Sequence, residues 1–231
     1  MIFRHGYEQL AGRVRSALHS RARPQQSSGW LPIQSGMLVT MVLAWGLGIA
    51  AGCFAVWNHA GTPGSQRAGA KYWPATTGLH HQANRATLVL FAHPHCPCTR
   101  ATIRELDRLV AQVAGSVDVQ VVFVQPSETN ADWAQTDIWR AAAEIPGVSV
   151  TADRTGAESI RFGADTSGEA FLYDTSGRLV FQGGITPARG HEGESAGRTA
   201  ITSWVTGHAG LGHAPVFGCP LLDLSILQKA E

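Results

Sequence analysis

The chain has 231 residues, which favours one folded domain with additional segments over two complete domains. Its hydrophobic content of 44% is ordinary for a globular protein, and its formal net charge of +1 gives no reason to expect nucleic acid as a partner. Four cysteines are too few for a disulfide scaffold in a chain of this length, so their positions carry more information than their number.

An uncharged apolar stretch covers residues 37–57. A helix of this length, rising about 1.5 Å per residue, spans the roughly 30 Å of a membrane's hydrocarbon core. A cleaved signal peptide, the main alternative, usually has a shorter apolar region that starts closer to the N-terminus. Arginines cluster before the stretch: Arg4, Arg13, Arg15, Arg21 and Arg23. By the positive-inside rule we expect a single-pass cell-membrane protein, with residues 1–36 in the cytoplasm and residues 58–231 outside it, in the periplasm of a bacterium.

The exported part begins with residues 58–85, which are rich in Gly, Ala, Pro, Thr and His and are predicted to form a linker. Hydrophobic periodicity predicts strands over 87–92, 117–125, 148–151, 169–173 and 178–182, with Gly183 and Gly184 ending the last one. Helices are expected from residue 99 to a stop at Gly115, and over 131–144, 157–162 and 192–208. This order predicts an α/β domain over 86–210, with a largely parallel sheet closed by an antiparallel hairpin. Residues 211–231 form a C-terminal extension.

Two cysteines lie between the first predicted strand and the first helix, in the loop His93-Pro94-His95-Cys96-Pro97-Cys98. The thiolate is the nucleophile in disulfide exchange, and free N–H groups at a helix N-terminus favour negative charge. We expect Cys96, as the more exposed thiol, to attack, Cys98 to resolve the mixed disulfide, and His95 to tune the site. His93 and Arg100 also favour a thiolate. The alternative is a pair of inert thiols packed as small apolar residues in a tethered scaffold.

The segments LVLFAHPHCPCTR and FGADTSGEAFLYDTSGRLVFQGG resemble the strand, active-site loop and closing hairpin of the thioredoxin superfamily, over about residues 80–210. HPHCPCTR and GGITPARGHEG are similar to the membrane-anchored thioredoxin-like proteins called RedB. The resemblance implies a thioredoxin-like fold of mixed sheet and flanking helices, and a thiol–disulfide oxidoreductase that acts on protein thiols or disulfides without a required cofactor. A reductive role would need a separate electron donor in the membrane.

The chain departs from the thioredoxin pattern at two places. One residue separates Cys96 from Cys98, where the family has two, and Gly168 stands where family members carry a cis-proline facing the cysteines. A peroxidase of the peroxiredoxin kind shares the fold, but it needs Thr or Ser three residues before its reactive cysteine. His93 occupies that position here, which disfavours a peroxidase.

The remaining cysteines differ in context. Cys53 lies inside the apolar stretch and is interpreted as an inert packing residue. Cys219, in the C-terminal extension, is a possible second resolving thiol or metal ligand if the extension lies across the domain. The alternative is that Cys219 is a packed or unpaired residue.

Metal binding is the second functional hypothesis. Imidazole and thiol groups suit copper or zinc, and the candidate ligands are His93, His95, Cys96, Cys98 and His191. Copper chaperones of the Sco type resemble this layout, because they have one membrane anchor, a thioredoxin-like domain, two cysteines and a distant histidine. In those chaperones three residues separate the two cysteines, whereas one residue separates Cys96 from Cys98.

Overall fold

The computed structural model describes residues 31–113 and 115–222. The chain divides into two units, Met1–Gly52 and Cys53–Glu231. The expected cytoplasmic segment up to residue 30, and the C-terminal extension after residue 222, lie outside the described residues.

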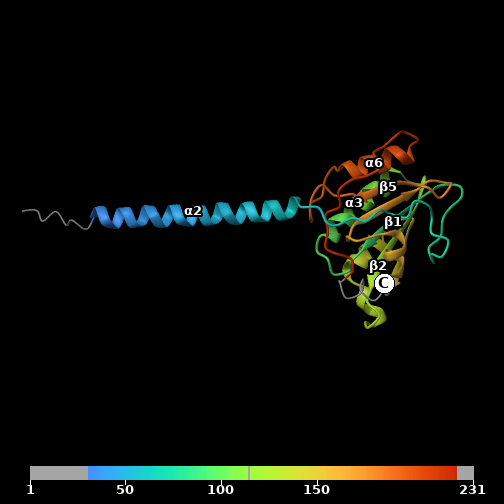
Figure 1. Ribbon diagram of the computed structural model, residues 1–231, viewed down its shortest axis with the longest axis horizontal. Coiled ribbons are helices and arrows are strands. Elements are labelled where there is room, and N and C mark those ends of the chain that lie inside the picture. The colour runs from blue at the N-terminus through green and yellow to red at the C-terminus, as the bar shows by residue number, and fades with distance from the viewer. Residues whose placement is uncertain (1–30, 114, 223–231) are drawn as a thin grey trace, which may run out of the picture. The chain divides into compact units, whose positions relative to one another are not determined.

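The first described element is the long helix α2, Leu31–Gly61 (Figure 1). Its Ser35–Gly61 part is long and apolar enough to cross a membrane, and none of its apolar window is buried. Large side chains such as Trp45 (71% exposed) and Leu47 (73% exposed) are therefore left uncovered by the described residues. A membrane anchor and a signal sequence both have this character.

Within the described residues, five strands form one mixed sheet in the order β3-β2-β1-β4-β5 (Figure 1). Their bounds are Ala86–Ala92 for β1, Val117–Gln125 for β2, Val148–Arg154 for β3, Glu169–Tyr173 for β4 and Leu179–Gly184 for β5. Strands β1, β2 and β3 run parallel, β4 pairs antiparallel with β1, and β5 pairs antiparallel with β4. In the centre, Leu88 lies opposite Val119 of β2 and Leu172 of β4. Because both faces of β1 are covered, its apolar run has no polar alternation.

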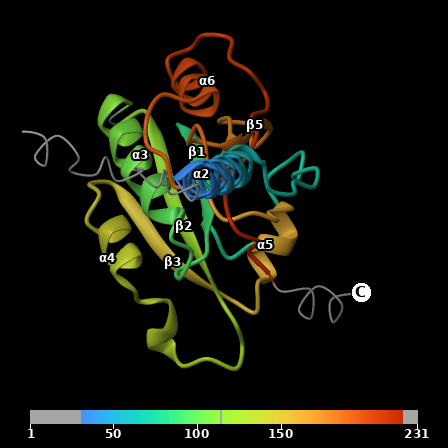
Figure 2. The same cartoon turned by 90° about the vertical axis from the view of Figure 1, so that its left-hand side faces the viewer.

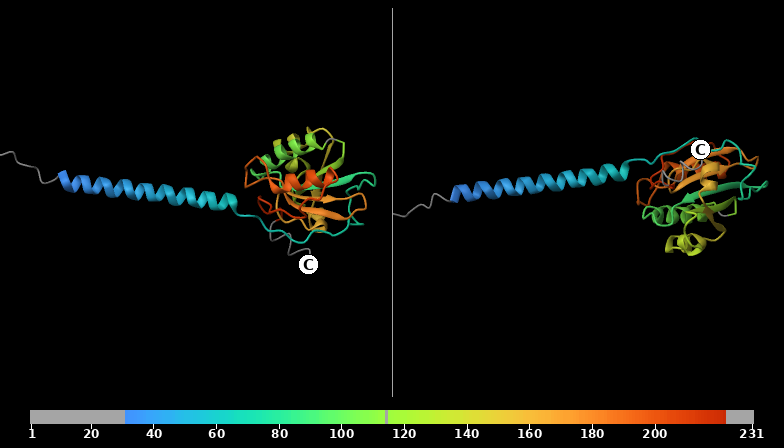
Figure 3. Two further views of the ribbon diagram at one scale, coloured as in Figure 1. Left: turned by 90° about the horizontal axis from the view of Figure 1, so that it is seen from above. Right: turned by 60° about the horizontal axis from the view of Figure 1, so that its bottom comes forward.

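Helices cover the two faces of the sheet unequally. The remaining elements are α3 (Thr99–Gln112), the 3-10 turn η1 (Ala131–Ala134), α4 (Asp137–Ala143), α5 (Ala157–Phe162) and α6 (Ala196–Val205). One core cluster joins the sheet to α3, α4 and α6, which lie side by side in Figures 2 and 3. On the opposite face a second cluster packs α5, part of residues 62–85 and the C-terminal segment against the sheet. These layers are those of an α/β thioredoxin-like fold, as the sequence predicts.

Residues 62–85 include a stretch that docks on the second face. The backbone N–H of Trp73 donates to Gly177 at 2.8 Å, and that of Leu179 donates to Lys71 at 3.0 Å. The Trp73 ring packs edge-on against Phe162 and Tyr173. This stretch therefore contributes to the core of the domain.

Several elements differ from their predicted bounds: β3 runs on to Arg154, α3 ends at Gln112, and three further differences have a clear local cause. Residues 131–144 form two elements, because η1 ends at Ala134 and the Thr136 side chain caps a new helix, α4, by accepting from the N–H of Trp139. Helix α6 starts later than expected, at the cap Ser195. Strand β5 continues through Gly183 and Gly184. A Cβ at Gly183 would lie 2.3 Å from the carbonyl oxygen of Ala214, so these glycines admit the crossing C-terminal segment and do not end the strand.

Candidate active site

The cysteine loop connects the end of β1 to the start of α3. Cys98 immediately precedes α3 and already has helical backbone angles, φ −66° and ψ −28°. A turn closed by the Cys96 N–H and the His93 carbonyl, at 3.2 Å, turns Cys96 inward. Cys96 is 2% exposed whereas Cys98 is half-buried, so the expectation that Cys96 is the more exposed thiol is wrong. The C-terminal segment, which the local sequence does not reveal, contacts Cys96.

A third cysteine lies against this pair. The Sγ atom of Cys219 is 2.9 Å from the Sγ of Cys96, in hydrogen-bonding contact. The Sγ atoms of Cys96, Cys98 and Cys219 all lie within 4.8 Å of one another, and each cysteine is a free thiol. The extension thus crosses the domain and carries Cys219 to the site. Cys53 is exposed on α2.

The three thiols have different acidities. Burial opposes ionisation of Cys96, but hydrogen bonds from the thiol and backbone of Cys219, from the Thr99 hydroxyl and from the backbone of Cys98 outweigh it and lower the pKa of Cys96. Burial and the neighbouring Cys96 charge raise the pKa of Cys98. Burial, together with the hydrogen bond and charge of Cys96, raises the pKa of Cys219 to about 12. Of the three thiols, Cys96 is therefore the most readily ionised, and Cys98 and Cys219 hold their protons more tightly than an ordinary cysteine.

The positive charge of Arg189 acts on two of the thiols. It lowers the pKa values of Cys98 and Cys219 and thereby opposes the effect of burial there. Its guanidinium donates to the carbonyl of Gly218, next to Cys219, and to that of Thr62 at 3.2 Å. Arg100, which the sequence placed near the thiolate, forms an ion pair with Asp137.

The loop before β4 forms the opposite wall of the site. The Ser167 hydroxyl accepts from the N–H of His93 at 2.8 Å, and the N–H of Gly168 donates to Phe91 at 2.8 Å. Gly168 has a φ of +92°, in the left-handed region. Proline, whose φ is fixed at about −65°, does not fit this backbone. The residue at the family's cis-proline position therefore follows a different chain path here.

The three candidate histidines lie outside the thiol group of the described residues. His95 is exposed, its ring packs on Trp133, and its Nε2 lies 3.0 Å from the Trp133 carbonyl. His93 accepts from the His95 N–H through Nδ1 at 3.2 Å. His191 Nδ1 lies 2.7 Å from the carbonyl of Arg189, in its own loop. The metal-ligand set that this geometry offers is therefore Cys96, Cys98 and Cys219, without the histidines.

Thr99, Ser167 and Arg189 are site residues that sequence reasoning did not single out. Thr99 could have been predicted from its position, because the first residue of a helix that follows a cysteine loop lies beside the thiols. Ser167 and Arg189 had only their positions in polar loops, which many surface residues share.

Fold and site together define a thioredoxin-like protein with a three-thiol centre. No family model matches the chain, and no curated protein matches it. Among solved structures, an uncharacterized conserved protein from Geobacillus kaustophilus is similar with a TM-score of 0.51 and 16% identity, over 70% of this chain and 92% of that one. A hypothetical protein from Sinorhizobium meliloti gives 0.48 and 24%, over 69% and 93%. A secreted disulfide oxidoreductase of Mycobacterium tuberculosis, homologous to E. coli DsbE, gives 0.39 and 13%, over 54% and 82%.

Proposed function

We propose that this chain is a thiol–disulfide oxidoreductase in which Cys96 is the attacking thiol. The observation that carries the proposal is the pairing of a lowered pKa at Cys96 with two protonated thiols within 4.8 Å. Disulfide exchange needs this combination, because the thiolate attacks and a second thiol must then resolve the intermediate. Inert structural thiols do not need it.

The reaction proceeds in two exchanges. The Cys96 thiolate attacks one sulfur of a partner's disulfide; that bond breaks, a mixed disulfide forms, and the partner's other sulfur leaves as a thiolate. A second thiol of the chain, Cys98 or Cys219, then attacks the Cys96 sulfur and releases the partner's first sulfur. Two electrons pass to the partner, and the chain keeps a disulfide. The reverse sequence oxidises a partner dithiol.

The proposal includes the location and the class of partner. Helix α2 would serve as a single-pass membrane anchor with the arginine-rich residues 1–36 in the cytoplasm, because nothing in the described residues covers its apolar side chains. The thiols would then act on proteins outside the cytoplasm, where disulfides persist, and sustained reduction would need a membrane donor. The RedB resemblance is part of this proposal; both of its segments, 93–100 and 183–193, contribute residues to the site.

The test is catalysis by the full chain in detergent, with a fluorescently labelled peptide disulfide as substrate and dithiothreitol as reductant. We expect the chain to accelerate reduction of the peptide and Cys96→Ser to abolish the acceleration. His95→Ala tests whether His95 tunes the site, through a shift of the pH profile. Cys53→Ser is the matched control, since Cys53 lies on α2, and it should keep the full rate. A chain no faster than its Cys96→Ser variant would refute the proposal.

The mutual approach of three sulfur atoms supports a second candidate, a metal-binding chaperone. Three thiolates suit copper(I) or zinc, and Cys96, Cys98 and Cys219 would be the ligands. Purification without chelator and elemental analysis decide between the candidates. Near-stoichiometric copper or zinc that disappears in Cys219→Ser would favour the chaperone, whereas metal-free chain with peptide-reducing activity would favour the oxidoreductase.

A further inference from the structure

The last described residues, 218–222, lie along the loop before β4 as an added strand, here named the tail strand. The N–H of Ser167 donates to the carbonyl of Cys219 at 2.8 Å, and the N–H of Leu221 donates to that of Asp165 at 2.8 Å. Between these bonds, Thr166 and Pro220 form an antiparallel bridge. Main-chain groups on alternate residues make the pairing, as in strand addition at a sheet edge.

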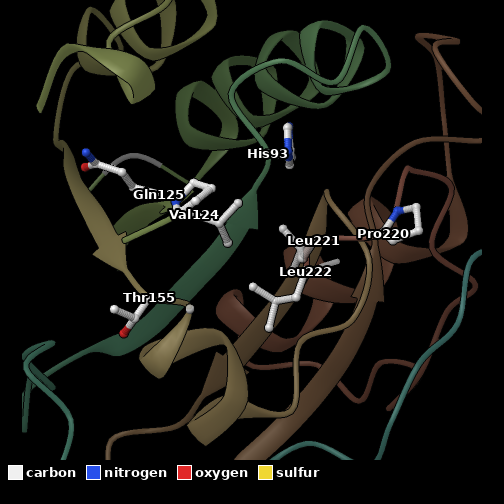
Figure 4. A pocket seen from close by; sticks show the side chains of 9 residues that line it. His93, Val124, Gln125, Thr155, Pro220, Leu221 and Leu222 are labelled. Atoms are coloured by element: carbon white, nitrogen blue, oxygen red, sulfur yellow. The ribbon is translucent and has the colours of Figure 1, made fainter. Parts of the chain in front are cut away.

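The tail strand fits its groove closely. A Cβ at Gly218 would lie 1.9 Å from the carbonyl oxygen of Ser167, so a larger residue there forces the strand away. Leu221 and Leu222 are 3% and 8% exposed and belong to the core cluster of the second face. Together with Val124 and with His93, which directly follows β1, they line a cavity of about 40 Å³ (Figure 4). The strand is therefore docked by shape and burial as well as by hydrogen bonds.

The same strand blocks the reactive thiol. An attacking thiolate must meet the sulfur of a partner directly, and the place beside the Cys96 Sγ is taken by the Cys219 Sγ at 2.9 Å. Cys96 is only 2% exposed in this arrangement. A partner disulfide reaches Cys96 only after the tail strand has moved.

We propose that the tail strand is a redox latch over the site: Cys219 resolves the mixed disulfide at Cys96, and the Cys96–Cys219 disulfide then holds the strand closed. The proposal rests on the proposed oxidoreductase function and specifies its regulation. The Cys219 thiol gives up its proton and attacks the Cys96 sulfur. The bond between Cys96 and the partner breaks, and the partner sulfur leaves as a thiolate that takes up a proton. The chain is oxidised by two electrons, and the partner disulfide is reduced to two thiols.

The two oxidation states differ in access to the site. In the reduced chain, hydrogen bonds and two leucines hold the tail strand, so that it opens and closes reversibly. In the oxidised chain the disulfide adds a covalent tie, so the site stays closed until a dithiol attacks. Cys98 is then the thiol that remains beside the pair.

The experiment uses the full chain in detergent and the substitution Gly218→Ala, which displaces the tail strand without changing a cysteine. Gly212→Ala is the matched control, because Gly212 is exposed in the same segment and a Cβ there meets only an ordinary contact at 3.7 Å. Two quantities are measured by peptide mass spectrometry: the disulfides formed with oxidised glutathione, and the rate at which N-ethylmaleimide modifies Cys96 in the reduced chain.

We expect the unsubstituted chain and Gly212→Ala to form mainly the Cys96–Cys219 disulfide. In Gly218→Ala we expect that disulfide to be replaced by Cys96–Cys98. Modification of Cys96 should accelerate about tenfold, because the equilibrium constant for local opening of the tail strand rises about tenfold. A dominant Cys96–Cys98 disulfide in the unsubstituted chain would overturn the latch. This result comes from the disulfides of the unsubstituted chain, so it tests the latch even if Gly218→Ala does not fold.

Failure of the latch and failure of the proposed function give different results. If the unsubstituted chain reduces the peptide disulfide but forms no Cys96–Cys219 bond, the latch is wrong and the oxidoreductase stands. If the bond forms and Gly218→Ala exposes Cys96, yet neither protein accelerates peptide reduction, the latch stands and the oxidoreductase is wrong.

Discussion

The hydroxyl oxygens of Ser167 and Thr99 lie 2.9 Å apart, buried between the loop before β4 and the first turn of α3. Ser167 also accepts from the N–H of His93, and the Thr99 hydroxyl donates to the His93 carbonyl at 3.3 Å. These bonds join the cysteine loop to the segment that pairs with the tail strand. The buried Ser167–Thr99 contact therefore links the loop that carries Cys96 to the segment on which Cys219 is docked.

Ser167→Ala is expected to weaken this junction. It removes the acceptor of the His93 N–H and the partner of the buried Thr99 hydroxyl, so the free energy of unfolding should fall by about 1–3 kcal/mol. Urea unfolding followed by tryptophan fluorescence measures the loss. Ser116→Ala, at an exposed turn, is the control and should change little. Equal losses in the two variants would show that the contact contributes nothing of its own.

The pKa of Cys96 is expected to lie below 9.0, the value of an ordinary cysteine. Burial raises this pKa, but hydrogen bonds to the thiolate outweigh the effect of burial. A folded-state pKa below the unfolded value adds stability that is present above the unfolded pKa and is lost as the pH falls through the folded pKa. The stability difference between the reduced chain and Cys96→Ser should therefore grow with rising pH. Ultraviolet absorbance of the thiolate, compared with Cys96→Ser, gives the midpoint, and a midpoint at or above 9.0 would contradict the prediction.

Most of the fold could be predicted from local patterns. The second strand, the short helix after the third strand, and the first strand of the hairpin have the bounds that the sequence predicts, because apolar periodicity and turn residues define them locally. The extension of β5 through Gly183 and Gly184 could not be predicted. A glycine pair usually ends a strand, and here it leaves room for a distant segment that no local pattern announces.

The site was predictable only in part. The sequence placed Cys96 and Cys98 at the start of a helix, since strand, loop and helix are adjacent along the chain. The contact of Cys219 with Cys96 joins residues 123 positions apart, and the burial of Cys96 follows from that contact. The sequence predicted histidines near the thiols, but nearness in sequence does not fix where a ring points. The ring of His95, for example, lies against Trp133.

Glu105 ties α3 to the loop that carries Arg189. Its buried carboxylate, 0% exposed, accepts from Arg198 at 2.7 Å and from the N–H of Gly193 at 2.8 Å. Removing one partner of a buried ion pair leaves the other charge uncompensated, so Glu105→Ala should lower the free energy of unfolding by about 3–5 kcal/mol. Urea unfolding measures this, with the exposed Glu194→Ala as control. A loss as small as that of the control would show that Arg198 finds another partner or water.

Arg189 is expected to support the exchange reaction through its charge. In Arg189→Gln the pKa values of Cys98 and Cys219 should rise further, because the charge that lowers them is gone, and the contact with the Gly218 carbonyl is lost. Peptide-disulfide reduction should slow by about tenfold at neutral pH, the factor that about 1.4 kcal/mol represents. The control, Arg140→Gln, changes an exposed arginine on α4 and should keep the full rate.

The pH profile of Arg189→Lys distinguishes charge from packing. Lysine keeps a positive charge but cannot donate to the Thr62 and Gly218 carbonyls in the same forked geometry. If the charge acts on the thiols, the rate profile of Arg189→Gln shifts to higher pH and that of Arg189→Lys stays near the unsubstituted chain. If Arg189 only holds the tail strand in place, both variants change the rate by the same factor at every pH, and the electrostatic role is wrong.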